Sequence, residues 1–143
     1  MTHSLQIVIA CEDPAALSRF WAAALDYIVQ PPPEGFESWD EFADSIGVPE
    51  EMRNDFGAVV DPHGVGPRIL FERYDGGEPN QRVHFDMNVI DAPVGEDERK
   101  EILAQERGRL ESLGATFKRE ATGVAGEYWI EMFDPEGNWF CVQ

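Results

Sequence analysis

The sequence is poor in basic residues and in cysteine, and it has no long apolar run. Eleven Lys and Arg residues stand against 28 Asp and Glu residues, which gives a formal net charge of −17. Nucleic acids and anionic membrane surfaces bind basic protein surfaces, so neither is expected as a partner. No apolar stretch approaches the roughly 18 residues that span a membrane, and no basic segment precedes an apolar one at the N-terminus.

The two cysteines, Cys11 and Cys141, are too few for a disulfide framework. A reduced, cytoplasmic protein is therefore expected. The chain has 143 residues and is 43% hydrophobic, which is enough for one compact domain or for two small modules that share a core.

One order of elements is predicted twice along the chain: a strand, a helix and three more strands. In the first copy these are residues 5–10, a helix beginning at Asp13-Pro14, and strands 27–29, 56–60 and 67–74. In the second copy they are residues 82–89, a helix over 96–113 capped by Gly114, and strands 116–119, 128–133 and 139–142. Residues 75–80 resemble a linker between the copies.

A matching turn precedes the last strand of each copy. The turns are Asp61-Pro62-His63-Gly64 and Asp134-Pro135-Glu136-Gly137. If the copies superpose, Gln6 corresponds to His84, and Glu72 corresponds to Cys141.

The first predicted helix has a clear beginning, because Asp13 is a suitable N-cap and Pro14 suits the first helical position. Its apolar stripe consists of Leu17, Phe20, Trp21, Ala24 and Leu25. The strand over residues 82–89 alternates, so that His84, Asp86 and Asn88 share one face.

Residues 34–56 interrupt the first copy. Ser38 and Glu41 have the spacing of a capping box, which predicts a short helix over residues 39–46 that Gly47 ends. The segment has too many apolar side chains for a solvated linker. It is either a lid packed over a binding site or a helical insertion that covers the sheet edge.

The duplicated βαβββ pattern, the two Asp-Pro-x-Gly turns and the run from Gly126-Glu127-Tyr128-Trp129 to Asn138 resemble the vicinal oxygen chelate superfamily. That superfamily includes glyoxalase I, bleomycin-resistance proteins, fosfomycin-resistance enzymes and extradiol dioxygenases, and the chain is most similar to bacterial glyoxalase-like proteins. The resemblance implies an α+β fold in which modules 1–77 and 81–143 form one curved eight-stranded mixed sheet around a cleft. It covers nearly the whole chain except residues 34–56.

The resemblance also implies a ligand set, because a divalent metal in this superfamily is held by the first and last strands of each module. The matching positions are Gln6, Glu72, His84 and Cys141. Zn, Ni, Mn or Fe is the implied metal, and a Cys, His, Glu and Gln set suits zinc. Glyoxalase I has a carboxylate where Cys141 stands. The two-histidine, one-carboxylate set for iron is incomplete, because Gln6 takes the place of the second histidine.

Each of these residues also has a simpler interpretation. His84 would be a cavity histidine that hydrogen-bonds Asp86 or Glu72 without a metal. Cys141 would be a small buried hydrophobic residue, and Gln6 would form hydrogen bonds at a strand edge.

Two function classes follow from the resemblance. One is a metal-dependent enzyme, a lyase, isomerase or dioxygenase, that acts on a small oxygenated metabolite, with Glu72 or Glu131 transferring the proton. The other is a metal-free drug- or metabolite-binding protein of the bleomycin-resistance type. In either class Asp86, Trp39 and Trp129 are predicted to contact the small molecule, and the resemblance implies a homodimer.

Overall fold

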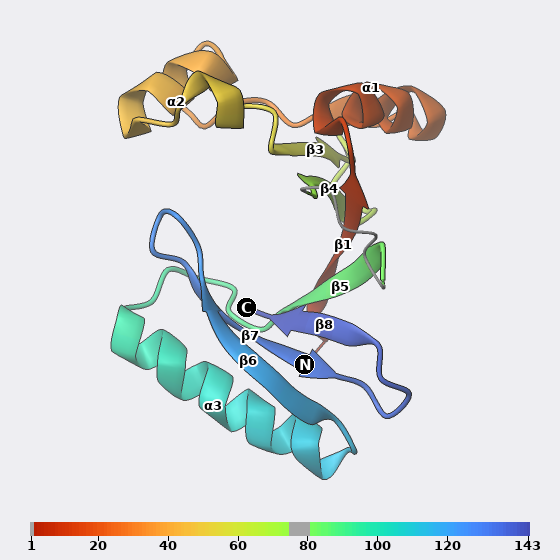
Figure 1. The fold of residues 1–143 in the computed structure, drawn as a ribbon, viewed down its shortest axis with the longest axis vertical. Coiled ribbons are helices and arrows are strands. Elements are labelled where there is room, and N and C mark those ends of the chain that lie inside the picture. The colour runs from red at the N-terminus through yellow and green to blue at the C-terminus, as the bar shows by residue number, and fades with distance from the viewer. Residues whose placement is uncertain (1, 75–80) are drawn as a thin grey trace. The chain divides into compact units, whose positions relative to one another are not determined.

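The computed structural model describes residues 2–74 and 81–143 (Figure 1). Its elements are β1 (Ser4–Cys11), α1 (Pro14–Leu25), β2 (Ile28–Val29), α2 (Trp39–Ile46), the short 3-10 helix η1 (Glu50–Met52), β3 (Phe56–Val60), β4 (Arg68–Arg73), β5 (Val83–Asn88), α3 (Glu96–Ser112), β6 (Thr116–Thr122), β7 (Tyr128–Phe133) and β8 (Trp139–Val142). The predicted linker, residues 75–80, lies outside the described residues. No helix in the described ranges is both long and apolar enough to cross a membrane.

The eight strands form one mixed, unclosed sheet in the order β2-β3-β4-β1-β5-β8-β7-β6. Strand β5 pairs in parallel with β8, whereas the β2–β3, β3–β4, β6–β7 and β7–β8 pairs are antiparallel. The predicted α+β fold with an eight-stranded mixed sheet is therefore confirmed. The element order also repeats as predicted, with α2 and η1 inserted between β2 and β3.

The chain divides into two compact units, and β1 contributes to both of them. The N-terminal unit is Val8–Arg82, and the C-terminal unit combines the residues up to Ile7 with Val83–Gln143. The predicted module boundaries, 1–77 and 81–143, assigned all of β1 to the first module. By its contacts, the first half of β1, which contains Gln6, belongs to the C-terminal unit, and the division into two modules stays a prediction.

In the N-terminal unit, α1 lies very close to β3. Asp13 caps the helix as predicted by accepting a hydrogen bond from the Ala16 amide. The helix buries Pro14 and Ser18 against the sheet, so the predicted apolar stripe is only partly correct: Phe20 is 60% exposed. The close approach explains the difference, because the helix residues that lie against Gly57 of β3 are Pro14 and Ser18, which have small side chains.

Gly57 on β3 makes this approach possible. A Cβ added there would lie 2.5 Å from Ser18 Oγ and 2.9 Å from the Pro14 carbonyl oxygen. We expect Gly57→Ala to destabilise the fold by about 1–3 kcal/mol, because the helix must move away from the strand. Gly108→Ala is the matched control: Gly108 is in the middle of α3 with open space around its Cβ position. It should stabilise the protein by about 0.5–1 kcal/mol. Urea denaturation measures both, and equal stabilities for the two variants would contradict the close approach.

The two Asp-Pro-x-Gly turns are built in the same way. Asp61 accepts hydrogen bonds from the amides of His63, Val65 and Gly66. In the second turn Asp134 accepts from the amides of Glu136 and Asn138.

The fourth residues of the turns, Gly64 and Gly137, have φ of +69° and +86°, a conformation that favours glycine. The amide hydrogen bonds, with the Asn138 side chain contributing most at Asp134, hold the pKa of both aspartates below the usual value. The sequence similarity between the turns therefore reflects one local structure.

In the C-terminal unit, α3 covers β6 and β7 (Figure 1). Its buried residues Leu103 and Leu110 pack with Ile130, Met132 and Val142 to form the core of the unit. Helix α3 ends at Ser112, and Gly114 follows with φ of +103°, as expected for the residue after a helix. Because the core occupies one face of the sheet, the side chains of the opposite face are left to form a site.

Candidate metal centre

Strand β5 buries its polar side chains and exposes apolar ones. His84 and Asp86 are 7% and 5% exposed, whereas Val83 and Phe85 are about half exposed. Alternation along the strand places His84, Asp86 and Asn88 on the sheet face opposite α3. Burying an imidazole and a carboxylate is costly unless both have partners, so this face has a specific role.

Strand register aligns a row of polar residues across that face. Asp86 on β5 pairs with Cys141 on β8, and Cys141 pairs with Glu131 on β7. Glu131 in turn pairs with Arg119 on β6. Residues that pair directly share a sheet face, so Asp86 and Cys141 lie side by side.

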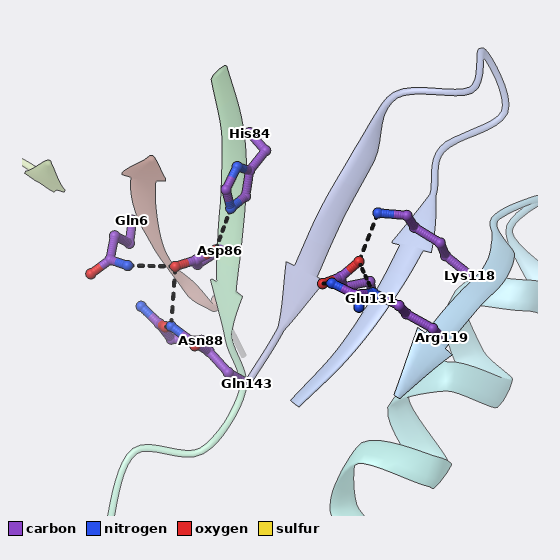
Figure 2. A network of polar contacts seen from close by, with 8 residues as sticks. All are labelled: Gln6, His84, Asp86, Asn88, Lys118, Arg119, Glu131 and Gln143. Atoms are coloured by element: carbon purple, nitrogen blue, oxygen red, sulfur yellow. Dashed lines mark hydrogen bonds and ion pairs between the residues drawn. The ribbon is translucent and has the colours of Figure 1, made fainter. Parts of the chain in front are cut away.

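The Asp86 carboxylate is held by two amides (Figure 2). Gln6 Nε2 donates a short hydrogen bond to Asp86 Oδ2, and Gln143 Nε2 lies 3.4 Å from the same oxygen. Gln143 also donates to Asn88 Oδ1 at 3.0 Å. The residues therefore fix one carboxylate oxygen and direct the other toward His84.

That second oxygen, Asp86 Oδ1, is buried and has no hydrogen-bond partner. It lies 3.3 Å from His84 Nε2, close enough for an ion pair but without the geometry of a hydrogen bond. The His84 ring stacks on Trp139 with 3.8 Å between ring centroids and 28° between planes. The imidazole is thus held beside a carboxylate oxygen that accepts no hydrogen bond. Buried polar atoms nearly always have a hydrogen-bond partner, so this oxygen needs an explanation.

The arrangement contains a group of side chains that could hold a metal ion. One imidazole nitrogen of His84, an Asp86 oxygen and Cys141 Sγ lie within 4.8 Å of one another, and all three residues are buried. Bond lengths of about 2.0–2.1 Å around tetrahedral zinc place nitrogen and oxygen ligands about 3.3 Å apart. The observed His84–Asp86 distance matches this value. The three residues therefore offer one nitrogen, one oxygen and one sulfur donor, all of which are types that bind zinc.

Glu131 continues the polar row but has a different role. Lys118 Nζ donates to Glu131 Oε2 at 2.7 Å, and Arg119 donates to both carboxylate oxygens at 2.7 and 2.8 Å. A register shift between Phe117 and Arg119 lets these adjacent side chains reach the same face. Burial alone would raise the pKa of the Glu131 carboxyl, but the hydrogen bonds from Arg119 and Lys118 outweigh it and keep the pKa below its usual range.

The predicted site residues are distributed over both units. Gln6, His84 and Cys141 lie together with Asp86 in the C-terminal unit, whereas Glu72 and Trp39 belong to the N-terminal unit. The predicted proximity of Glu72 to His84 stays a prediction. Trp129 is on β7 opposite Ala121, on the same sheet face as Glu131, and its contact with a small molecule is also still a prediction.

From the sequence, Asp86 is predicted to contact the small molecule or to hydrogen-bond His84, but it is not included among the metal ligands. A signal was present, because His84 and Asp86 are two residues apart on one strand and must share a face. Lys118 and Arg119 were missed altogether. Their convergence on Glu131 depends on the register shift, which alternation along a regular strand does not predict.

A family model described as a glyoxalase-like domain matches residues 6–143, and the chain belongs to that family.

Solved structures share the fold at low sequence identity. A glyoxalase/bleomycin resistance protein/dioxygenase superfamily member from Vibrio splendidus 12B01 is 15% identical, with a TM-score of 0.52, and the match covers 99% of this chain and 97% of that one. Methylmalonyl-CoA epimerase from Mycobacterium tuberculosis is 13% identical, with a TM-score of 0.57 and coverage of 98% and 85%.

A third structure, described as NAD-dependent benzaldehyde dehydrogenase from Legionella pneumophila, is 14% identical, with a TM-score of 0.59 and 96% coverage of both chains. No curated protein is a significant match to the sequence. The names of the three structures differ in activity, so the likeness shows the fold and leaves the reaction to be argued from the site.

Proposed function

We propose that this glyoxalase-like protein is a divalent-metal-dependent lyase, isomerase or dioxygenase that acts on a small oxygenated metabolite. His84, Asp86 and Cys141 would hold the metal. The observation that supports this most directly is the buried Asp86 oxygen, which lies 3.3 Å from an imidazole nitrogen without hydrogen bonding to it. Three protein ligands leave a coordination position for a substrate oxygen.

The donor set favours zinc over the other metals that the family resemblance implies. Nitrogen, oxygen and sulfur are all ordinary zinc ligands. Iron in a two-histidine, one-carboxylate site would need a second imidazole, and Gln6 takes the corresponding place. The Gln6 amide donates to Asp86, so we assign Gln6 the role of orienting that carboxylate.

The bound metal would supply a Lewis acid that polarises a carbonyl oxygen of the substrate. Trp139 and the amides of Gln6 and Gln143 hold the imidazole and carboxylate in place, which limits their reorganisation. Glu131 was predicted as a proton carrier, but its two cations hold it ionised and make it a weak base. Glu72 remains the proposed proton-transfer residue.

The second candidate function is that of a metal-free binding protein. One observation favours it: the side-chain amides of Gln6 and Gln143 lie against one oxygen of the Asp86 carboxylate, so the protein itself partly satisfies this group. In that case the polar face would supply hydrogen bonds to a ligand, and Cys141 would be a buried structural residue.

Elemental analysis distinguishes the two functions. Protein purified without an affinity tag should contain about one zinc ion per chain, and a chelator should remove it at a rate that rises as the pH falls, because the ligands must be deprotonated to bind. Protein that contains no metal and fails to bind added Zn²⁺, Ni²⁺, Mn²⁺ or Fe²⁺ would leave only the binding function.

We also propose that the chain forms a homodimer. Leu5, Val83 and Phe85 are 46–51% exposed on the neighbouring strands β1 and β5. They lie on the sheet face opposite Gln6 and Asp86, and a second copy would cover this apolar strip. We expect Phe85→Lys to shift the protein from dimer to monomer in light scattering, whereas Phe20→Lys should leave the mass unchanged. A wild-type mass near 16 kDa at all concentrations would contradict the dimer.

A further inference from the structure

A second site lies entirely in the N-terminal unit, beneath the inserted segment. It is a cavity of about 600 Å³ between α1, α2 and strands β2 to β4. Apolar side chains from the insertion and the sheet form most of its wall, among them Trp39, Phe42, Ile46, Phe56 and Leu70. This volume falls within the range of about 300–1,000 Å³ that accommodates small organic ligands.

The insertion forms an ordered wall over this cavity. Ser38 caps α2 by accepting a hydrogen bond from the Glu41 amide, as the sequence predicts. Trp39 Nε1 donates to the Gln30 carbonyl oxygen at 2.8 Å, which ties the start of α2 to the end of β2. Phe42 meets Trp39 edge to face, with 5.9 Å between ring centroids. The insertion therefore does more than cover the sheet edge, because it encloses space against the sheet.

The charge of the cavity wall is opposite to that of the chain. Three of the eleven basic residues, Arg19, Arg53 and Arg68, line the cavity, whereas Asp40 is the one lining residue among the 28 acidic ones. Arg53 forms ion pairs with Asp40 and with Asp44 outside the cavity, so it serves mainly to hold the insertion. Arg19 on α1 and Arg68 on β4 also contribute positively charged groups to the wall.

Arg68 is held in place at the cavity wall. Its Nε donates to Gln30 Oε1 at 2.6 Å, and Gln30 also receives the Trp39 hydrogen bond through its backbone. A guanidinium group can bind a carboxylate or a similar oxyanion while it keeps another hydrogen bond, because it has five N–H donors. A half-buried cation beside aromatic side chains recognises a ligand that is both apolar and anionic.

We propose that this cavity binds a small organic acid, in which an apolar body lies against Trp39, Phe42 and Leu70 and an oxyanion group faces Arg19 and Arg68. The net charge of −17 repels anions from the protein surface in general, so the arginines give this cavity a local selectivity. The site shares no residue with the His84–Asp86–Cys141 centre and does not depend on the proposed metal. It assigns a ligand class to the cavity beneath the insertion.

The test uses 2-naphthoate as the probe and 2-naphthalenemethanol as its neutral counterpart. Calorimetry with the full chain should show that naphthoate binds at least about tenfold more tightly than the alcohol, a ratio typical of one charge-assisted hydrogen bond. Naphthoate should also quench tryptophan fluorescence, and Trp39→Phe should remove that part of the quenching.

Arginine variants show which side chains cause the preference for naphthoate over the neutral alcohol. Arg68→Met should reduce naphthoate affinity about tenfold and leave the affinity for the alcohol unchanged. Arg19→Met tests the second cation on an exposed helix position, where folding is not at risk, and should also lower naphthoate affinity selectively. Arg109→Met, which removes a cation on α3 outside the cavity, is the matched control and should change neither affinity.

Three outcomes would overturn the proposal: no binding of naphthoate, equal affinity for the acid and the alcohol, or equal loss in the Arg109→Met control. His84→Ala should leave naphthoate affinity unchanged. If His84→Ala abolishes naphthoate binding, the probe occupies the metal centre and the cavity assignment is wrong. Loss of metal in His84→Ala with naphthoate binding intact would support both sites separately.

Discussion

Replacing His84 with alanine is expected to lower zinc affinity by at least about 100-fold. Loss of outer hydrogen bonds to a metal ligand already reduces affinity by about 10–100-fold, so removal of a ligand should cost more. Asp86→Asn should have a similarly large effect, because it replaces a charged oxygen ligand with a neutral amide. Competition with a zinc-sensitive dye gives the affinities of the purified variants.

Two further variants make the result specific. Gln6→Ala should lower zinc affinity about 10–100-fold, because the Asp86 carboxylate would lose its orienting hydrogen bond. His63→Ala is the matched control, since it removes an imidazole from the exposed turn after β3. Full zinc content in His84→Ala, or an equal loss in His63→Ala, would mean that the metal binds elsewhere.

The largest effect on stability is expected at Glu131. Glu131→Gln should lower the free energy of unfolding by about 2–3 kcal/mol. The value is below the 3–5 kcal/mol typical of breaking a buried pair, because the two cations are partly exposed and can be rehydrated. Glu131 is 3% exposed and binds both cations on β6. Glu101→Gln, on the exposed surface of α3, is the matched control and should change stability by less than about 0.5 kcal/mol.

The same ion pairs predict a pH dependence. The pKa of Glu131 is lowered in the folded state, so its contribution to stability is fully present above the ordinary glutamate value of 4.5 and is lost as the pH falls through the folded-state pKa. Urea midpoints of the wild type in chelator should therefore fall below about pH 4.5, and the decrease should be smaller in Glu131→Gln. Parallel pH profiles for the two proteins would show that Glu131 does not cause this loss of stability at low pH.

Much of the fold can be predicted from the sequence, because local signals and tertiary structure agree. Asp13, Ser38 and Gly47 begin or end helices at their predicted positions, and β3, β7 and β8 have the predicted bounds. The side chains of Asp61 and Asp134 accept hydrogen bonds from amides within the predicted turns or one to two residues beyond them. These features depend on interactions over a few residues, which periodicity and capping rules describe.

Features that depend on strand register were not predictable. Strand β6 extends to Thr122, beyond the predicted end at residue 119, because it pairs with β7 along its whole length. The place of Asp86 beside Cys141 follows from the parallel β5–β8 pair, whose partners are 55 residues apart in the chain. Alternation predicts which residues share a face of one strand, but only register shows which residues of other strands they meet.

Helix α1 shows a second limit of prediction from the sequence, which concerns the burial of side chains. Its sequence has a clear apolar stripe, yet Ser18 is buried and Phe20 is exposed. Hydrophobic periodicity predicts which side chains would benefit from burial. It does not predict that Gly57 lets the backbone of the helix approach so closely that only small side chains fit between them.

The absorption spectrum of the protein loaded with Co²⁺ tests the metal centre most directly. Cobalt replaces zinc in such sites, and a bound thiolate gives a charge-transfer band in the near ultraviolet. We expect this band in the wild type and in Cys11→Ser, and its loss in Cys141→Ser with a weak visible band remaining from His84 and Asp86. A cobalt complex without the thiolate band, or a band that persists in Cys141→Ser, would contradict the assignment of His84, Asp86 and Cys141 as the metal ligands.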